Sequence, residues 1–120
     1  MADTPAPKLP LKSPRSITGA QRRALRALGH HLKVIVHVGQ RGVSEQVIAA
    51  AAEALEHHEL IKISTLRDGP VGHKEAPHLL ADAVGAHVAQ IVGRTALLYR
   101  RHPEDPQVKI PGAIDMGDPS

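Results

Sequence analysis

Apolar residues recur along the first part of the chain with two spacings, one typical of a helix and one typical of a strand. A Thr-x-x-Gln capping box opens a helix predicted over residues 18–30, which places Ala24, Leu25 and Leu28 on one side. The next run, residues 33–38, is short, β-branched and almost continuously apolar, which predicts a buried strand. The first unit of the fold is therefore a helix followed by a strand.

The same alternation continues through the middle of the chain. In residues 43–58 the aliphatic residues share one helical face and the glutamates share the opposite one, which predicts a second helix. Residues 60–66 predict a second strand, and Asp68-Gly69-Pro70 marks a turn after it. A proline at the first position and a glycine after the last predict a short third helix over residues 77–84.

Two β-prone runs complete the pattern. Residues 87–92 and 95–100 are separated by Gly93-Arg94, and a two-residue link that begins with glycine is typical of a tight hairpin. The predicted order is α-β-α-β-α-β-β, an α/β single domain in which helices pack against a four-stranded mixed sheet. Strands separated by helices imply mostly parallel crossovers, and the hairpin adds an antiparallel pair.

Length and composition limit the chain to one small domain with an aliphatic core. Its 120 residues include one tyrosine but no phenylalanine, tryptophan or cysteine, which excludes disulfides and thiolate metal sites. Residues 1–15 and 102–120 are proline-punctuated and are predicted to be a flexible arm and an acidic tail around a domain of residues 16–101. Because no signal peptide or membrane span is recognisable, a soluble cytoplasmic protein is expected.

Charge is distributed unevenly over the predicted domain. Residues 16–101 carry eleven Lys and Arg against seven Asp and Glu, and the second helix and its end hold four of the seven acids. Phosphate would be repelled from the flank of that helix and attracted elsewhere. Three arginines of the first helix also fall within one arc of roughly 100°. The basic residues predicted to contact an anion are Arg22, Arg23, Arg26, Lys33, Arg41 and Arg94.

The link Gly39-Gln40-Arg41-Gly42 has the features of a phosphate-binding turn. A strand-to-helix turn brings backbone N–H groups and the positive end of the helix dipole to one spot. Gly39 and Gly42 let the backbone approach an anion, and Arg41 adds a full positive charge. The same device clamps backbone nucleotides in KH domains, while two glycines at such a turn can also serve backbone geometry alone.

Four segments of the chain occur in an order that is far more specific than any one of them. They are TGAQR at 18–22, GQRG at 39–42, ALEHHELIK at 54–62 and IVGRTALLYR at 91–100. Together they resemble the CRM-domain family, named for chloroplast RNA splicing and ribosome maturation, and in particular its stand-alone bacterial proteins of the YhbY type.

The resemblance implies an RNA-binding domain whose topology is similar to that of the C-terminal domain of translation initiation factor three. It implies that Gly39, Gln40, Arg41 and Gly42 contact RNA, with basic residues around them as support. It also implies association with pre-ribosomal particles, through precursor large-subunit ribosomal RNA. Residues 68–76, which are punctuated by glycine and proline, and the acidic tail depart from the family pattern.

Side-chain patterns for catalysis or metal binding are weak. The nine histidines include two adjacent pairs whose members point in different directions, and neither pair is completed by a convincing set of carboxylates. The serines lack a nucleophile-elbow context, and Ser44 is predicted to cap the second helix. With Tyr99 as the only aromatic residue besides histidine, RNA shape and backbone are expected to dominate recognition. A non-enzymatic protein without metal or cofactor is expected.

Two other functions stay open at this point. The first is an enzyme that binds a small phosphorylated ligand through residues 39–42. The second is an adaptor whose acidic helix face and acidic tail recognise a basic ribosomal protein. A calorimetric comparison of nucleotides with RNA tests the first, and neutralising Glu45, Glu53 and Glu56 tests the second.

Overall fold

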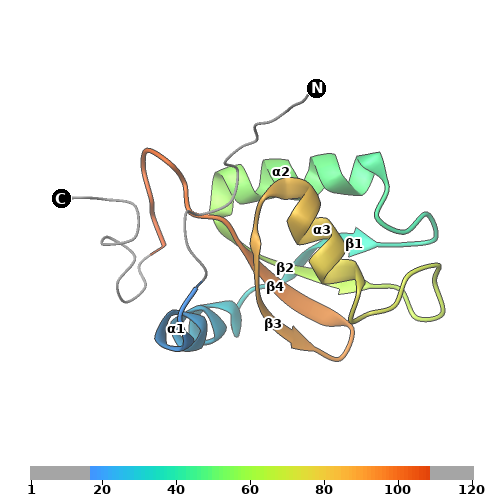
Figure 1. The fold of residues 1–120 in the computed structure, drawn as a ribbon, viewed down its shortest axis with the longest axis horizontal. Coiled ribbons are helices and arrows are strands. Elements are labelled where there is room, and N and C mark those ends of the chain that lie inside the picture. Colours follow the sequence, from blue (N-terminus) through green and yellow to red (C-terminus); the bar gives the residue numbers. More distant parts are fainter. Residues whose placement is uncertain (1–16, 109–120) are drawn as a thin grey trace, which may run out of the picture.

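The computed structural model of the chain describes residues 17–108 and places three helices and four strands in this range (Figure 1). Their bounds are α1 Gly19–Gly29, β1 Val34–Val38, α2 Glu45–His58, β2 Leu60–Thr65, α3 Ala76–Val84, β3 His87–Val92 and β4 Thr95–Tyr99. Every predicted element is confirmed, with its ends moved by no more than two residues. The predicted N-terminal arm and residues 109–120 of the predicted tail lie outside the described residues.

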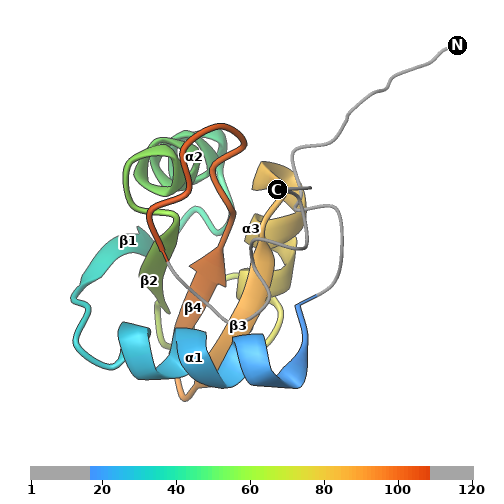
Figure 2. The same ribbon diagram turned by 90° about the vertical axis from the view of Figure 1, so that its left-hand side faces the viewer.

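The elements form three layers, with the sheet between α1 on one face and α2 with α3 on the other (Figure 2). The strand order is β1-β2-β4-β3. The pair β1–β2 is parallel, whereas β2–β4 and β3–β4 are antiparallel. Both helical crossovers therefore join strands that point the same way. Two of the three pairings are nevertheless antiparallel, because the final hairpin inserts β4 between β2 and β3.

The helices begin and end where local chemistry favours it. Thr18 and Gln21 form the predicted capping box of α1, since each side chain binds the backbone N–H of the other at 2.9–3.0 Å. Ser44 caps α2 by accepting from the N–H of Val47 at 3.2 Å. At the end of α3, Gly85 adopts a left-handed conformation with φ of 70°. These caps confirm the predicted starts of α1 and α2 and the predicted end of α3.

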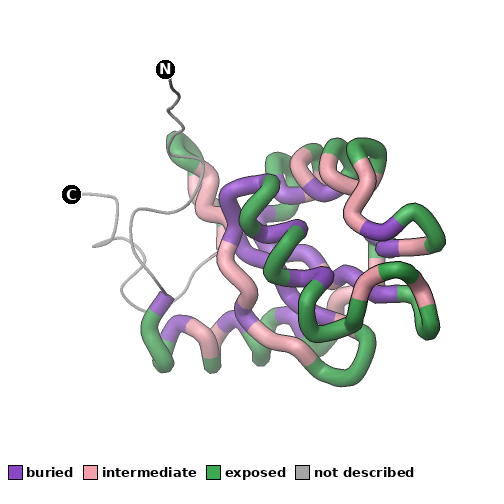
Figure 3. Tube along the Cα trace, turned by 45° about the vertical axis from the view of Figure 1, so that its right-hand side comes forward, coloured by how far each residue is buried: buried purple, intermediate pink, exposed green. Residues whose placement is uncertain are grey.

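Two aliphatic clusters hold the layers together, one on each face of the sheet. The buried residues gather in the strands and on the sides of the helices that face them, whereas the loops are mostly exposed (Figure 3). The larger lies between the sheet and α2 with α3, where Leu55, Ile63 and Leu80 are almost completely buried. The smaller lies under α1, where Leu25 packs with Leu60, Leu97 and Tyr99. The face that carries α1 therefore has the smaller core.

Two predictions about burial are wrong on the α1 side. The prediction of a fully buried first strand fails because β1 lies at the edge of the sheet, where Ile35 is 48% exposed and His37 is also exposed. Only Val36 and Val38, which face α2 and α3, are buried. Leu28 of α1, predicted on the apolar side of this helix, is 45% exposed, because it borders an open hollow beside Leu32 and Val108 and not the packed core.

Residues 102–108, predicted to begin the tail, are attached to the domain by a buried carboxylate. Glu59, which follows α2 with φ of 63°, is only 2% exposed. Its carboxylate accepts from the backbone N–H groups of His102, Gln107 and Val108, each at 2.6 Å. Charge-assisted bonds of this length fix the course of this segment.

Candidate functional site

Three loops meet at one end of the sheet, where β1 and β2 end and the β3–β4 hairpin turns (Figure 1). The N–H of Leu66 donates to the carbonyl of Val38 at 2.8 Å, and the N–H of Thr65 donates to the carbonyl of Arg94 at 2.8 Å. These bonds bring together residues 39–42, the start of the 66–75 loop and the 93–94 turn. Arg41 and Arg94, which are 53 positions apart in the sequence, therefore belong to the same end of the domain.

The Gly39–Gly42 loop forms a tight turn whose two glycines have different roles. The N–H of Gly42 donates to the carbonyl of Gly39 at 3.0 Å. Gly42 is buried with φ of 68°, a conformation that favours glycine, and a Cβ there would lie 3.4 Å from Pro70 Cγ. Nothing lies within 4 Å of the Cβ position of Gly39. Gly42 therefore serves the turn, while Gly39 leaves open space on the loop.

The side chains of these three loops form an exposed, charged surface. Gln40 and Arg41 are both exposed, as are Arg67, Lys74 and Arg94 in the neighbouring loops. Three exposed carboxylates, those of Glu45, Asp68 and Glu75, also belong to this end of the domain. Lys and Arg thus outnumber Asp and Glu here, and Glu45 lies on the first turn of α2, where the helix dipole stabilises its charge.

The arginines of α1 do not form a single stripe. The guanidinium of Arg22 is half-buried and donates to the carbonyls of Val88 at 2.6 Å and Ala89 at 3.2 Å, so it attaches α1 to β3. Arg23 and Arg26 are exposed. Of the three predicted contacts in this helix, the two exposed arginines are the ones whose charges face solvent.

Two lysines lie beside the end of α1. Lys33, a predicted contact, is exposed just before β1. Lys62, which sequence reasoning missed, lies in the middle of β2 and is half-buried. Leu60, two residues earlier, belongs to the cluster under α1, and Ile61 belongs to the cluster on the opposite face. Because residues two apart in a strand share a face, the side chain of Lys62 lies on the α1 face. The signal for it was one lysine within an otherwise apolar strand pattern.

Charges are separated between the two sides of the sheet. Residues 18–44, 60–67 and 83–103 contain no Asp or Glu, and these ranges include α1 and all four strands. The described carboxylates lie on α2 and its end, in the 66–75 loop, on α3 and at residues 104–105. The α1 side is therefore cationic, and the outer surface of α2 is acidic.

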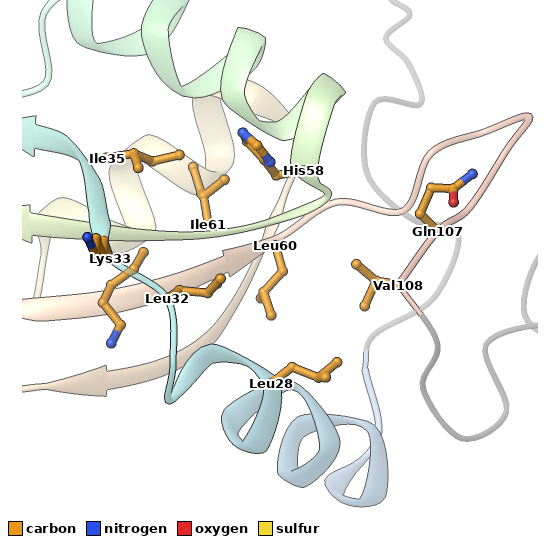
Figure 4. A pocket seen from close by; sticks show the side chains of 10 residues that line it. Leu28, Leu32, Lys33, Ile35, His58, Leu60, Ile61, Gln107 and Val108 are labelled. Carbon is orange, nitrogen blue, oxygen red and sulfur yellow. The ribbon is translucent and has the colours of Figure 1, made fainter.

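A mainly apolar hollow lies between the end of α1, the start of β1 and residues 107–108 (Figure 4). Its volume is about 520 Å³. Leu28, Leu32, Ile35, Leu60 and Val108 give it an aliphatic lining. Lys33 and Lys62 also line this hollow, so it adjoins the cationic surface, although aliphatic side chains make up most of its lining.

Tyr99 is unsuited to base stacking and to proton transfer. Its side chain is fully buried under α1. Burial, and secondarily the nearby Glu59 carboxylate, raise the pKa of the phenol to about 12.

Within residues 17–108, no cluster of three or more His, Asp or Glu side chains is arranged to hold a metal ion. No helix in that range is long and apolar enough to span a membrane.

Comparisons with known proteins match the chain over nearly all of the described residues. The model of the CRS1 / YhbY (CRM) domain family matches residues 17–100. The protein named "Probable RNA-binding protein YqeI" of Bacillus subtilis is 37% identical over 95 residues, which cover 79% of this chain and 99% of the relative. A Haemophilus influenzae protein named "RNA-binding protein" is 31% identical over 80% of this chain and 96% of the relative.

A solved structure supports the same relationship at the level of the fold. The solution structure of SAV1595 from Staphylococcus aureus superimposes with a TM-score of 0.68 at 32% sequence identity. The match covers 79% of this chain and 99% of the other. The α/β architecture with three helices and a four-stranded mixed sheet is thus shared with this neighbour.

Proposed function

Since the chain belongs to the CRS1 / YhbY (CRM) domain family, we propose that it binds structured RNA through the cationic surface on the α1 side of the sheet. This surface consists of the Gly39–Gly42 loop, Arg23 and Arg26 of α1, Lys33, Lys62 and the hairpin residue Arg94. The relatives' names, which describe RNA-binding proteins, support RNA as the partner.

The observation that carries the proposal is the separation of charge across the sheet. A surface that is cationic and free of carboxylates over α1 and all four strands attracts a polyanion along its whole length. The acidic face of α2 repels the same polyanion and so orients the domain on it. A small phosphorylated ligand would need only one cationic loop, and the extent of the surface favours a nucleic acid.

Recognition by backbone and shape follows from the chemistry of the surface. Arginine and lysine bind phosphates without reading sequence, and Gly39 leaves room for a ribose-phosphate chain to approach the backbone. Folded or double-stranded RNA presents closely spaced phosphates in a fixed geometry. We therefore expect affinity for structured RNA with a steep dependence on salt.

The finer proposal is that the protein acts in the cytoplasm on large ribosomal subunit precursors, without catalysis and without a cofactor. It derives from the family resemblance. Sedimentation of cell extract through a sucrose gradient tests it. Migration with large-subunit precursors supports the proposal, and a position at the top of the gradient at low salt contradicts it.

Replacing Arg41 tests the RNA site directly. Arg41→Gln removes one exposed charge and should weaken binding to a ribosomal RNA fragment about tenfold, since a charged hydrogen bond is worth about 1.5–3 kcal/mol. The slope of log affinity against log salt should fall by about 0.9. A filter-binding titration at several salt concentrations measures both quantities.

Ala50→Glu is the matched control for this experiment. It changes the net charge by the same amount at an exposed position of α2. It should leave the salt slope unchanged, because no phosphate contact is lost. If both variants changed RNA affinity and the salt slope equally, the effect would come from net charge alone, and the assignment of Arg41 to the RNA site would be contradicted.

A further inference from the structure

A second, smaller hollow lies on the α1 face of the sheet, between the last turn of α1 and the β3–β4 hairpin. Its volume is about 320 Å³, at the lower end of the range of about 300–1,000 Å³ that small-molecule sites occupy. The residues around it are Gly29, His30, Lys62, Gln90, Val92, Thr95, Ala96 and Leu97. We call it the α1–hairpin hollow.

Close packing of α1 on the sheet makes one wall of this hollow. Gly29 lies so near β4 that a Cβ there would collide with the side chain of Leu97. The last turn of α1 therefore comes down onto the sheet, and His30 follows it at the rim. Because α1 crosses only one end of the sheet, this face has no helix over it toward the hairpin in the described part of the chain (Figure 1).

The side chains around the hollow offer groups that a nucleotide uses. The amide of Gln90 is half-buried and forms no hydrogen bond within residues 17–108, so its donor and its acceptor are both available there. Lys62 is a half-buried cation. The His30 ring is exposed and can stack on a base. Hydrogen-bonding, charge and stacking groups thus converge on one small space.

A row of cross-strand neighbours joins this hollow to the phosphate loop. His37 pairs with Ser64, Ser64 with Thr95, and Thr95 with Val92. The His37 ring and the Ser64 hydroxyl are 2.8 Å apart and face solvent on the α1 side. His37 lies two residues before Gly39, and two strand spacings of about 4.8 Å separate β1 from β4. The loop and the hollow therefore lie on one continuous surface.

We propose that the α1–hairpin hollow holds one unpaired RNA nucleotide beside the helical segment bound by the Gly39–Gly42 loop. His30 stacks on the base, the amide of Gln90 binds its edge, and Lys62 faces its phosphate. The proposal rests on the proposed RNA-binding function and deepens it. The preferred ligand is a stem with an unpaired nucleotide, such as a bulge, rather than a continuous duplex.

Two RNA probes test this proposal with the full chain. One is a fully paired stem-loop, and the other is the same stem with one bulged nucleotide. The protein should bind the bulged stem roughly tenfold more tightly, the effect expected for one stacked base. Equal affinity for the two stems would overturn the proposal.

Gln90→Leu, which keeps the size of the side chain and removes its amide, should reduce this preference to about twofold or less. Its affinity for the paired stem should not change. Gln46→Leu, the same substitution at an exposed position of α2, should keep the tenfold preference. A Gln90→Leu protein that keeps the full preference contradicts the role of this hollow.

A fluorescence measurement on the native chain makes the test independent of how the variants fold. When 2-aminopurine is placed at the bulge, stacking in the hollow should quench its fluorescence on binding. His30→Ala should prevent most of the quenching. An unchanged or increased fluorescence signal with the native protein overturns the proposal even if both stems bind.

Failure of both stems to bind contradicts the proposed function itself. Arg41→Gln should weaken the binding of both stems equally.

Discussion

The two faces of the sheet differ in what covers them. Two helices lie over one face, and they bury an aliphatic cluster that includes Leu55, Ile63 and Leu80. One helix lies over the other face and covers only part of it. On this face His37 is exposed, and Lys62 and Ser64 are half-buried. The first face is built mainly for stability, and the second leaves backbone and polar side chains open to a ligand.

The charges divide along the same line. The glutamates of α2 point outward from the well-covered face, whereas α1 and the strands have no carboxylates among their residues. A small domain buries a smaller fraction of its surface on folding, so leaving much of both sheet faces uncovered for binding would reduce its hydrophobic core. Placing the core and the acids on one side allows the other side to be cationic and partly uncovered. Stability and binding should therefore respond to different substitutions.

The largest effect on stability is expected from the core of the well-covered face. Leu80→Ala removes a fully buried side chain between α3 and the sheet and should lower the free energy of unfolding by about 3 kcal/mol. RNA affinity of the folded protein should stay within twofold, because no residue of the cationic surface is changed. Urea unfolding and a filter-binding titration measure the two quantities.

Leu79 provides the control for this substitution, since it is the next residue of α3 and is 51% exposed. Leu79→Ala should cost about 0.5 kcal/mol or less. If Leu80→Ala weakened RNA binding by the same free energy as it weakened folding, the division between the two faces would be wrong.

The two glycines of the 39–42 loop should separate stability from binding within one turn. Gly42→Ala places a side chain at φ of 68° and close to Pro70, and it should destabilise the fold by about 1–2 kcal/mol. Gly39→Ala meets no atom within 4 Å and should leave stability nearly unchanged. Its Cβ should instead obstruct the approach of the RNA backbone and weaken binding several-fold.

Thermal unfolding and RNA titration of both variants measure these effects. The comparison fails if Gly39→Ala binds RNA as well as the native chain does. It also fails if both variants lose stability equally, because the two positions would then have the same structural role.

Local pattern was enough to predict the elements and their caps. The spacing of apolar residues, the Thr18 and Ser44 caps and the Gly93-Arg94 hairpin each depend on neighbours within a few residues. The position of β1 at the sheet edge depends on which strands pair, and the hairpin decides that by inserting β4 beside β2. The local pattern of β1 carries no information about this.

Long-range contacts limited the prediction of the site in the same way. The guanidinium of Arg22 binds a carbonyl 66 residues away, so its role could not be distinguished from those of Arg23 and Arg26 by helical spacing. The burial of Glu59 depends on N–H groups more than 40 residues later in the chain. The cationic character of residues 39–42 was predictable, because it needs only the loop's own residues.

The smallest effect at neutral pH is expected from Tyr99, which lies under α1 at the less covered face. Its buried hydroxyl has no hydrogen-bond partner among the described residues, so Tyr99→Phe leaves no group unpaired. The free energy of unfolding should change by about 0.5 kcal/mol or less at pH 7.

Above pH 10 the stabilities of the native chain and of Tyr99→Phe should diverge. Because the folded-state pKa is raised from 10.0 to about 12, the native chain keeps this contribution below pH 10 and loses it as pH rises through 12. Tyr99→Phe should therefore be the more stable protein at alkaline pH. Urea unfolding between pH 7 and 12 measures the difference, in which all other titrating groups cancel. Parallel stability curves for the two proteins would mean that the phenol is accessible to water, and that α1 leaves this face more open than the packing of Leu25 on Tyr99 indicates.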